Sequence, residues 1–183
     1  MLINIQDLRD YLQLEDTSED MLLNDIIKAS STAIEKYCNR TFIKKEHSEL
    51  LEGTNYLYPT NTPVESVISV LKFETLEEVQ ANIFKDTIIL PRSSYVTLSG
   101  AVLNGNIEEK YIVNYVGGYN TVPHDIKQIV LEMSAIRYKK NREETLDIKS
   151  RNEAGLSTSY VGNDLILDEY KATLDLYKVV DLI

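Results

Sequence analysis

Two adjacent glycines, Gly117 and Gly118, follow a strand-like run and precede a segment that starts a helix at Pro123. A glycine turn between a strand and a helix could bind phosphate, because N–H groups at a helix start point toward an anion. That chemistry needs a GxGxxG or GxxxxGK[ST] pattern, whereas YNTVPHD follows the glycines and has no lysine or hydroxyl at the required places. We therefore interpret Gly117, Gly118 and Pro123 as a structural hinge between a sheet and a helix.

The other side chains with possible chemistry do not form a recognised motif. His47 and His124 lack HExxH or CxxC spacing, and Ser99 and Ser157 lack a GxSxG context. Cys38 is the only cysteine, which excludes an internal disulfide and is typical of a reducing cytoplasm. The remaining candidates are acidic groups that could hold Mg²⁺: Glu108, Glu109, Asp164, Asp168 and Glu169.

These patterns predict no catalytic residue, no metal site and no cofactor, and therefore a protein that is not an enzyme. Two alternatives stay open. The first is a metal-dependent hydrolase that uses the acidic clusters. The second is a small regulatory module that binds a ligand at the Gly-Gly turn. Metal titration would test the first, and a thermal-shift screen with nucleotides would test the second.

The net charge of −10 is concentrated at the two ends of the chain. Acids exceed bases by five in residues 1–38 and again by five in residues 143–183, whereas residues 39–142 are neutral. Broad binding to nucleic acid needs clustered Lys and Arg, so the composition argues against it. An acidic surface would instead let DNA pass without sticking. No apolar run is long enough to span a membrane, and the N-terminus lacks the pattern of a secretory signal.

Apolar residues at spacings of three and four predict long amphipathic helices over 18–38 and 123–142. The first should begin at a cap formed by Thr17 or Ser18 and end near Asn39, which tolerates a left-handed backbone. Shorter helices are expected after an Asn4 cap and around 166–176. Between the long helices the period changes to two, which predicts an antiparallel sheet of about four to six strands.

Two segments could contact other molecules. A basic cluster ends the second long helix, where it either complements the helix dipole or contacts an acidic part of an adjacent copy. It consists of Arg137, Lys139, Lys140 and Arg142. The C-terminal tail is apolar and β-prone, so it should either close its own sheet or add a strand to a partner. Its predicted docking residues are Tyr177, Val179, Val180, Leu182 and Ile183.

The predicted fold class is α+β and mainly helical. Two long antiparallel-packed helices and short N- and C-terminal helices would carry an inserted small antiparallel β-sheet. We expect one domain over residues 1–183. It would comprise N-terminal helices (1–40), a β insertion (41–119), the second long helix (120–142), and a mobile loop, short helix and docking tail (143–183).

The order of these parts resembles the head–tail connector (adaptor) family of tailed bacteriophages, which is also found in prophages. The helix end IEKYCNRTF, residues 34–42, is similar to one family signature, and VNYVGGYNTVPHDIKQIVLE, residues 113–132, to a second. LSTSYV at 156–161 is similar to a segment that precedes the last helix in many members. The resemblance covers most of the chain and depends on the order and spacing of these motifs.

The resemblance implies a structural protein of the virion neck, present in the host cytoplasm before assembly. Such subunits form a ring of about twelve copies under the portal, extend the DNA channel and provide the platform for the stopper or tail. The implied partners are other copies of the chain, the portal protein and a stopper or tail-completion protein. DNA would pass through the lumen without specific binding. The isolated subunit could be monomeric, with the tail at 177–183 docking into the portal.

Overall fold

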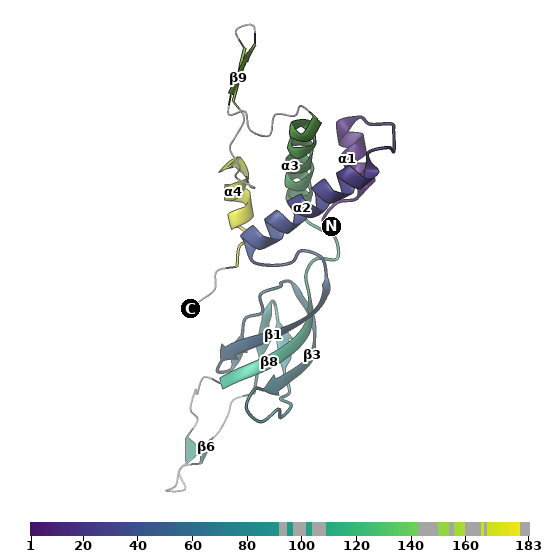
Figure 1. The fold of residues 1–183 in the computed structure, drawn as a ribbon. Coiled ribbons are helices and arrows are strands. Elements are labelled where there is room, and N and C mark those ends of the chain that lie inside the picture. Colours follow the sequence, from purple (N-terminus) through teal and green to yellow (C-terminus); the bar gives the residue numbers. More distant parts are fainter. Residues whose placement is uncertain are drawn as a thin grey trace. The chain divides into compact units, whose positions relative to one another are not determined.

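The computed structural model describes residues 1–91, 95–96, 102–103, 109–142, 150–153, 156–159, 166 and 168–179. The chain divides into two compact units, one formed by Met1–Arg40 with Val122–Ile183 and the other by Thr41–Thr121. The first contains the helices and the second contains the larger sheets (Figure 1). The expectation of a single domain stays a prediction, since two such units can still unfold together.

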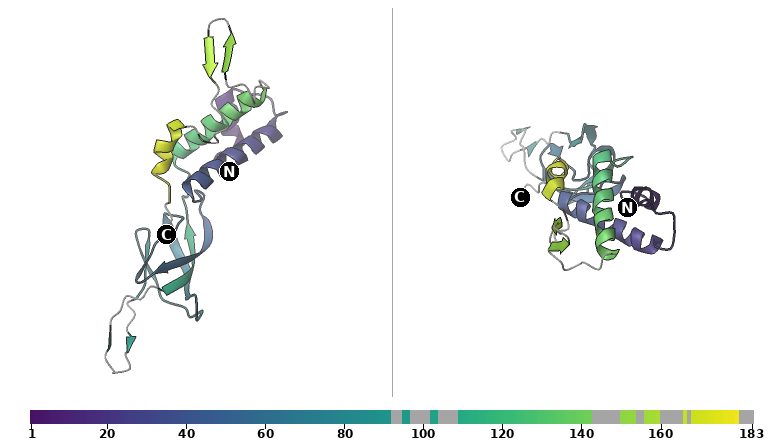
Figure 2. Two further views of the ribbon diagram at one scale, coloured as in Figure 1. Left: turned by 60° about the vertical axis from the view of Figure 1, so that its left-hand side comes forward. Right: turned by 90° about the horizontal axis from the view of Figure 1, so that it is seen from above.

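The first unit contains four helices, and their buried residues form its core. They are α1 (Ile5–Leu12), α2 (Asp20–Cys38), α3 (His124–Arg142) and α4 (Asp168–Asp175). Helices α2 and α3 pack against each other with opposed chain directions, so the end of α3 lies near the start of α2 (Figure 2). The buried side chains of α2 and α3 repeat at helical spacing: Leu23, Ile27, Ile34, Ile126, Val130 and Met133. Helices α1 and α4 each add one buried leucine, Leu8 and Leu174.

Local capping signals explain the start of α1 and the end of α2. Asn4 accepts a hydrogen bond from the Asp7 N–H, and the Asp7 carboxylate accepts one from the Asn4 N–H, which is a capping box. Asn39 ends α2 in the left-handed conformation, at φ 51°, as predicted. The prediction of a Thr17 or Ser18 cap is wrong. The Ser18 hydroxyl donates to Asp16 instead, and Glu19 occupies the N-cap position.

The second unit is built from two three-stranded antiparallel sheets. The first has the order β1-β8-β3, from β1 (Lys45–Gly53), β8 (Glu109–Gly117) and β3 (Val64–Lys72). The other has the order β2-β5-β4, from β2 (Tyr56–Leu57), β5 (Thr87–Ile89) and β4 (Asn82–Phe84). Their inner faces share one core, formed by Leu57, Val64, Val70, Ile88, Leu90, Tyr111, Val113 and Tyr115.

The predicted fold class, mainly helical with one small inserted sheet, is wrong. The β-rich unit has two sheets and a core of its own, so it is not a minor insertion in a helical protein. Two additional two-stranded ribbons are present, β6 (Tyr95–Val96) with β7 (Val102–Leu103), and β9 (Ser150–Glu153) with β10 (Leu156–Ser159). The second ribbon lies where the sequence predicted an irregular loop. The two sheets depend on pairings distant in sequence, which local periodicity does not reveal.

Candidate functional site

The acidic residues that could hold Mg²⁺ do not gather into a site where the structure describes them. Glu109 accepts a hydrogen bond from the Tyr111 hydroxyl at 2.9 Å and pairs with Lys72 at 3.2 Å. Asp168 pairs with Lys171 at 2.6 Å within α4. Glu108 and Asp164 lie outside the described residues. Across the part of the chain that the structure describes, no three His, Cys, Asp or Glu side chains converge on a possible metal position.

Cys38 is buried at the end of α2, and its Sγ lies 3.6 Å from the Leu174 carbonyl oxygen. Burial raises the pKa of the Cys38 thiol to about 11. The thiolate is the reactive form of cysteine, so a buried thiol with a raised pKa lacks the usual environment of a nucleophilic cysteine. Ser99 lies outside the described residues. Ser157 belongs to strand β10.

The three residues predicted as a hinge, Gly117, Gly118 and Pro123, lie between the end of β8 and the start of α3. Gly117 ends β8, and Gly118 has φ +105°, a conformation that side chains strongly disfavour. The Gly118 N–H donates to the Pro63 carbonyl at 3.1 Å. Pro123 precedes α3, and its carbonyl accepts from the Lys127 N–H, so Pro123 occupies the N-cap position. The helix therefore begins at His124, one residue later than predicted. Whether the three residues act as a hinge stays a prediction.

A partly buried polar cluster, which the sequence did not reveal, lies in the β-rich unit. It is formed by Glu49, Asn61 and Tyr115, and we refer to it as the Glu49 cluster. The Tyr115 hydroxyl donates to Glu49 Oε1 at 2.7 Å and accepts from the Asn61 N–H at 3.0 Å. Asn61 Nδ2 donates to Glu49 Oε1 at 2.7 Å, and the Thr60 N–H donates to Glu49 Oε2 at 2.9 Å.

The Glu49 cluster connects the loop before β3 to the sheet. Burial and the hydrogen bond to Glu49 raise the pKa of the Tyr115 hydroxyl, so this group stays a neutral donor. The Asn61 side chain also accepts from the Thr41 N–H at 2.7 Å. Every polar group named here has a partner within the unit, which is typical of a structural network rather than of a reactive site.

His47 lies against this cluster, with its ring stacked on Tyr115 at 5.4 Å between centroids. Burial, with a smaller contribution from Lys45, lowers the pKa of His47 from 6.5. The unfolded chain therefore takes up a proton more readily than the folded chain, and folding stability is lost as pH falls below 6.5.

We expect the His47→Gln variant to lose less stability than the natural chain between about pH 7 and pH 5, because it removes this difference in proton uptake. Urea unfolding midpoints at the two pH values, followed by circular dichroism, measure it. Carboxylates contribute equally to both proteins, so only the difference between the two pH slopes counts. Equal slopes would show that His47 titrates alike in the folded and unfolded chain.

The basic cluster at the end of α3 is partly used within its own unit. Arg142 pairs with Glu19 at 3.0 Å and donates to the Tyr138 hydroxyl at 3.0 Å, and that hydroxyl donates to Glu19. Arg137 is half-buried, and its burial lowers the pKa of the guanidinium. Lys139 is exposed, and Lys140 is partly exposed. The structure thus places one of the four bases against an acid of the N-terminal segment in the same copy.

The start of the C-terminal tail is held by the ends of α2 and α3. The Tyr177 hydroxyl donates to Asp125 at 2.8 Å, and the Val179 N–H donates to the Cys38 carbonyl at 2.9 Å. The Tyr37 hydroxyl donates to Asp175 at 2.8 Å. Val180, Leu182 and Ile183 lie outside the described residues. The described part of the tail is therefore held beside the end of α2.

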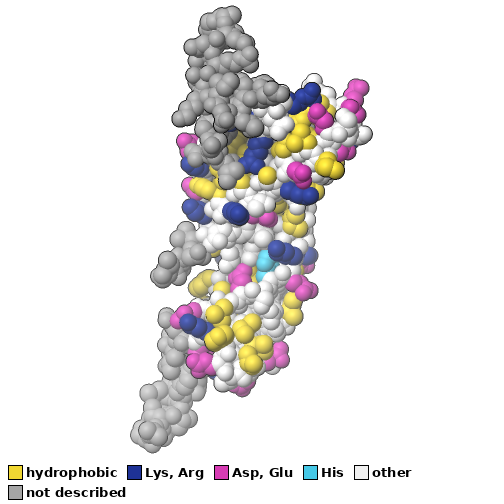
Figure 3. Space-filling view, in the orientation of Figure 1, with side chains coloured by type: hydrophobic (Ala, Val, Ile, Leu, Met, Phe, Trp, Pro, Cys, Tyr) yellow, Lys and Arg dark blue, Asp and Glu magenta, His cyan; other side chains and the backbone are white. Residues whose placement is uncertain are grey.

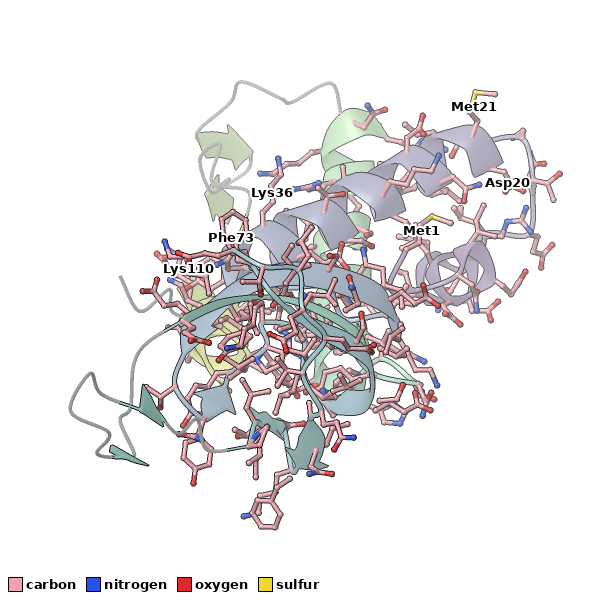
Figure 4. The ribbon with its side chains drawn as sticks, turned by 90° about the horizontal axis from the view of Figure 1, so that it is seen from below. Met1, Asp20, Met21, Lys36, Phe73 and Lys110 are labelled. Carbon is pink, nitrogen blue, oxygen red and sulfur yellow. The ribbon has the colours of Figure 1, made fainter. Side chains whose placement is uncertain are left out.

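Two surface pockets were considered as ligand sites. One of about 340 Å³ lies in the helical unit and is lined by Ile3, Asp7, Asp10, His124, Lys127, Gln128 and Leu131. Another of similar volume lies beside Phe73 and Lys110, which Figure 4 shows close together at one end of the sheet. Both have linings of mixed charge, and neither includes the Gly-Gly turn. Within the described residues, no helix is both long and apolar enough for a membrane span.

Comparisons with solved structures found the same fold in particle necks. The chain is similar to a protein in the "Neck of empty GTA particle computed with C6 symmetry", with 16% identity, a TM-score of 0.57, and coverage of 100% of this chain and 92% of that chain. For the "Neck of native GTA particle computed with C12 symmetry" the identity is 16% and the TM-score is 0.56, with coverage of 100% of this chain and 91% of that chain. For the "Virion of native gene transfer agent (GTA) particle" the identity is 15% and the TM-score is 0.53, with coverage of 100% of this chain and 92% of that chain.

The family assignment comes from the sequence itself. No curated protein matches the chain. A family model described as head completion protein matches residues 1–180, which is nearly the whole chain. The resemblance to phage head–tail connectors is thereby confirmed at the level of the family. This chain belongs to the head completion protein family.

Proposed function

We propose that this chain is a head–tail connector (adaptor) subunit of a tailed phage or prophage. Copies of it form a ring under the portal, extend the DNA channel and provide the platform for the stopper or tail. The observation that carries the proposal is the match of the head completion family model to residues 1–180. The proposed role is structural and involves no turnover of a substrate.

The likeness to neck proteins supports a ring in the virion neck. Proteins with the same fold occur in particle necks computed with C6 or C12 symmetry, and the likeness extends over the whole of this chain. We therefore propose a ring of about twelve subunits. The subunit would be made in the host cytoplasm and incorporated at the neck after DNA packaging. The net charge of −10 suits a channel through which DNA slides without specific binding.

The portal is the proposed partner of the C-terminal tail. Tyr177 and Val179 are held against α3 and α2, so the four residues that follow start from a defined position. Val180, Leu182 and Ile183 are apolar and β-prone, which suits addition of a strand to a partner sheet. Anchoring the start of the tail reduces the ordering entropy that docking must overcome.

We expect removal of residues 180–183 to abolish binding to the portal protein encoded by the same phage, with the melting temperature within about 1 °C of that of the full chain. The truncated residues lie beyond the anchoring hydrogen bonds, so folding should not depend on them. Co-sedimentation with portal rings measures binding, and electron microscopy of the complexes shows whether a connector ring forms. Calorimetry measures the melting temperature.

Asp181→Asn is the matched control, because it changes the tail without removing its apolar side chains. This variant should bind the portal as the full chain does. Undiminished binding by the truncated chain would refute the role of the tail while leaving the connector role intact. A full-length chain that forms no ring on its portal would refute the proposed function as a whole.

A further inference from the structure

The β-rich unit exposes apolar side chains on the outer face of both of its sheets. An antiparallel sheet that packs on a core through one face normally presents polar residues on the other. Here the outer face of each sheet departs from that pattern. We call them the β8 face and the β5 face after their central strands. The β8 face carries Leu50, Ile68, Leu71 and Ile112, and the β5 face carries Tyr56, Tyr58, Phe84 and Ile89.

Strand register places three apolar residues in one row across the β8 face. Leu50 of β1 pairs with Ile112 of β8, and Leu71 of β3 pairs with the same residue from the other side. Ile68 is the extra residue of a bulge in β3 and is 52% exposed, while Leu50 is 54% exposed. Figure 3 shows hydrophobic side chains gathered over β1, β8 and β3.

The β5 face presents aromatic side chains. Tyr56 pairs with Ile89, and both point away from the core, because their neighbours Leu57 and Ile88 are fully buried. Asn82 of β4 pairs with Ile89, so Phe84, two residues further along β4, lies on the same outer face. Phe84 is 64% exposed. Exposed aromatic residues at this density are typical of protein–protein interfaces.

The two faces lie on opposite sides of the unit, because the sheets pack through their inner faces around one core. A closed ring needs this arrangement. Each copy in a ring uses two different surfaces, one toward each neighbour, and the contact is heterologous. In a ring with twelvefold symmetry, adjacent copies differ by a rotation of only about 30°, so the two contact surfaces must be nearly opposed.

We propose that the β8 face of one copy packs against the β5 face of the next copy in the connector ring. This inference rests on the proposed function and adds to it the surfaces by which copies recognise each other. Tyr56, Phe84 and their neighbours would cover the apolar row of Leu50, Leu71 and Ile112. The residues of the basic cluster on α3 are not needed for this contact.

Charges at the margins of the two faces favour the same pairing. The β8 face has Glu46 and Glu52 on β1, with Lys110 of β8 located 3.9 Å from Glu52, so acids are in excess. The β5 face carries Lys85, whose Nζ lies 5.7 Å from the centre of the Phe84 ring. The Lys85 cation beside the aromatic residues of the β5 face would thus meet the acidic margin of the β8 face.

Cysteine cross-linking on portal-bound rings tests the pairing. The double variant Leu50→Cys with Phe84→Cys carries one thiol on each face, and both positions are exposed. After treatment with a short bifunctional maleimide, it should give a ladder of cross-linked copies. A mixture of the two single variants should give dimers only, and each single variant alone should stay monomeric on a denaturing gel. Native Cys38 is buried and should not react.

The matched control is Leu50→Cys with Leu176→Cys, because Leu176 is 82% exposed but lies in the helical unit. Rings that form without a ladder from the Leu50–Phe84 pair would overturn the inference while leaving the connector function standing. Dimers from Leu50→Cys alone would also overturn it, since they require two β8 faces in contact. The absence of any ring on the portal would refute the proposed function and this inference with it.

A second variant makes the test independent of cross-linking. Phe84→Asp should reduce ring assembly on the portal by roughly tenfold or more, because it places a charge at the centre of an apolar contact. Leu76→Asp is the control: Leu76 is 63% exposed in the loop after β3 and belongs to neither face. Equal assembly by Phe84→Asp and the natural chain, each with an unchanged melting temperature, would exclude the β5 face from the contact.

Discussion

Replacing Gly117 with alanine is expected to destabilise the β-rich unit by about 3 kcal/mol or more, a large part of the stability of an ordinary domain. A Cβ at this position would lie 2.0 Å from the Asn61 carbonyl oxygen and 2.7 Å from the Tyr115 ring. Neither neighbour can move readily, because the Asn61 N–H is hydrogen-bonded to the Tyr115 hydroxyl inside the Glu49 cluster. Urea unfolding followed by circular dichroism measures the loss.

Val116→Ala is the matched control, since it lies next to Gly117 in β8 but points to the outer face and is only partly buried. We expect this variant to lose no more than about 1 kcal/mol. A Gly117→Ala chain whose stability equals that of the control would show that the Asn61 backbone can shift. In that case the close approach of these two segments would not be a requirement of the fold.

Tyr115→Phe is expected to cost about 2 kcal/mol, although it removes a single oxygen atom. The lost hydroxyl donates to Glu49 and accepts from the Asn61 N–H, so the N–H loses this acceptor in a buried place, while Glu49 keeps its bonds from Asn61 Nδ2 and the Thr60 N–H. Asn61 is only 7% exposed, and the Tyr115 side chain is fully buried. Thermal and urea unfolding of the variant measure the change, with the fold checked by circular dichroism.

Tyr111→Phe provides the comparison on the same strand. Tyr111 is also buried, and its hydroxyl also donates to a carboxylate, that of Glu109, but Tyr111→Phe leaves the hydrogen bond from the buried Asn61 N–H to the Tyr115 hydroxyl in place. We expect this variant to lose clearly less stability than Tyr115→Phe. An equal loss of unfolding free energy in both variants would mean that removing any buried tyrosine hydroxyl has this cost. The Glu49 cluster would then contribute no additional stability.

These two positions connect stability to the proposed assembly. Gly117 and Tyr115 belong to β8, the central strand of the first sheet, whose outer side chain Ile112 lies in the apolar row of the β8 face. A rigid sheet holds such a row in one arrangement, which reduces the entropy lost when copies associate. Variants that loosen the Glu49 cluster without unfolding the chain should therefore also weaken ring assembly.

The helices of this protein could be predicted from its amino-acid sequence, because the signals that start and end a helix are local. The Asn4 cap, the left-handed residue at Asn39 and the apolar spacing of α2 and α3 all lie within a few residues of the features they predict. The order of the motifs around residues 34–42 and 113–132 also indicated the correct family, because a family resemblance depends on long stretches of sequence and not on single contacts.

The β-rich unit and its surfaces could not be predicted in this way, because they depend on contacts between distant parts of the chain. Strand β8 pairs with both β1 and β3, and the Glu49 cluster joins residues 49, 61 and 115, which no local pattern connects. The sequence therefore predicted one small sheet where two sheets enclose a core. The outer apolar faces were missed for the same reason: in a short strand, alternation shows that two faces differ, but only the packed partner sheet shows which face is covered.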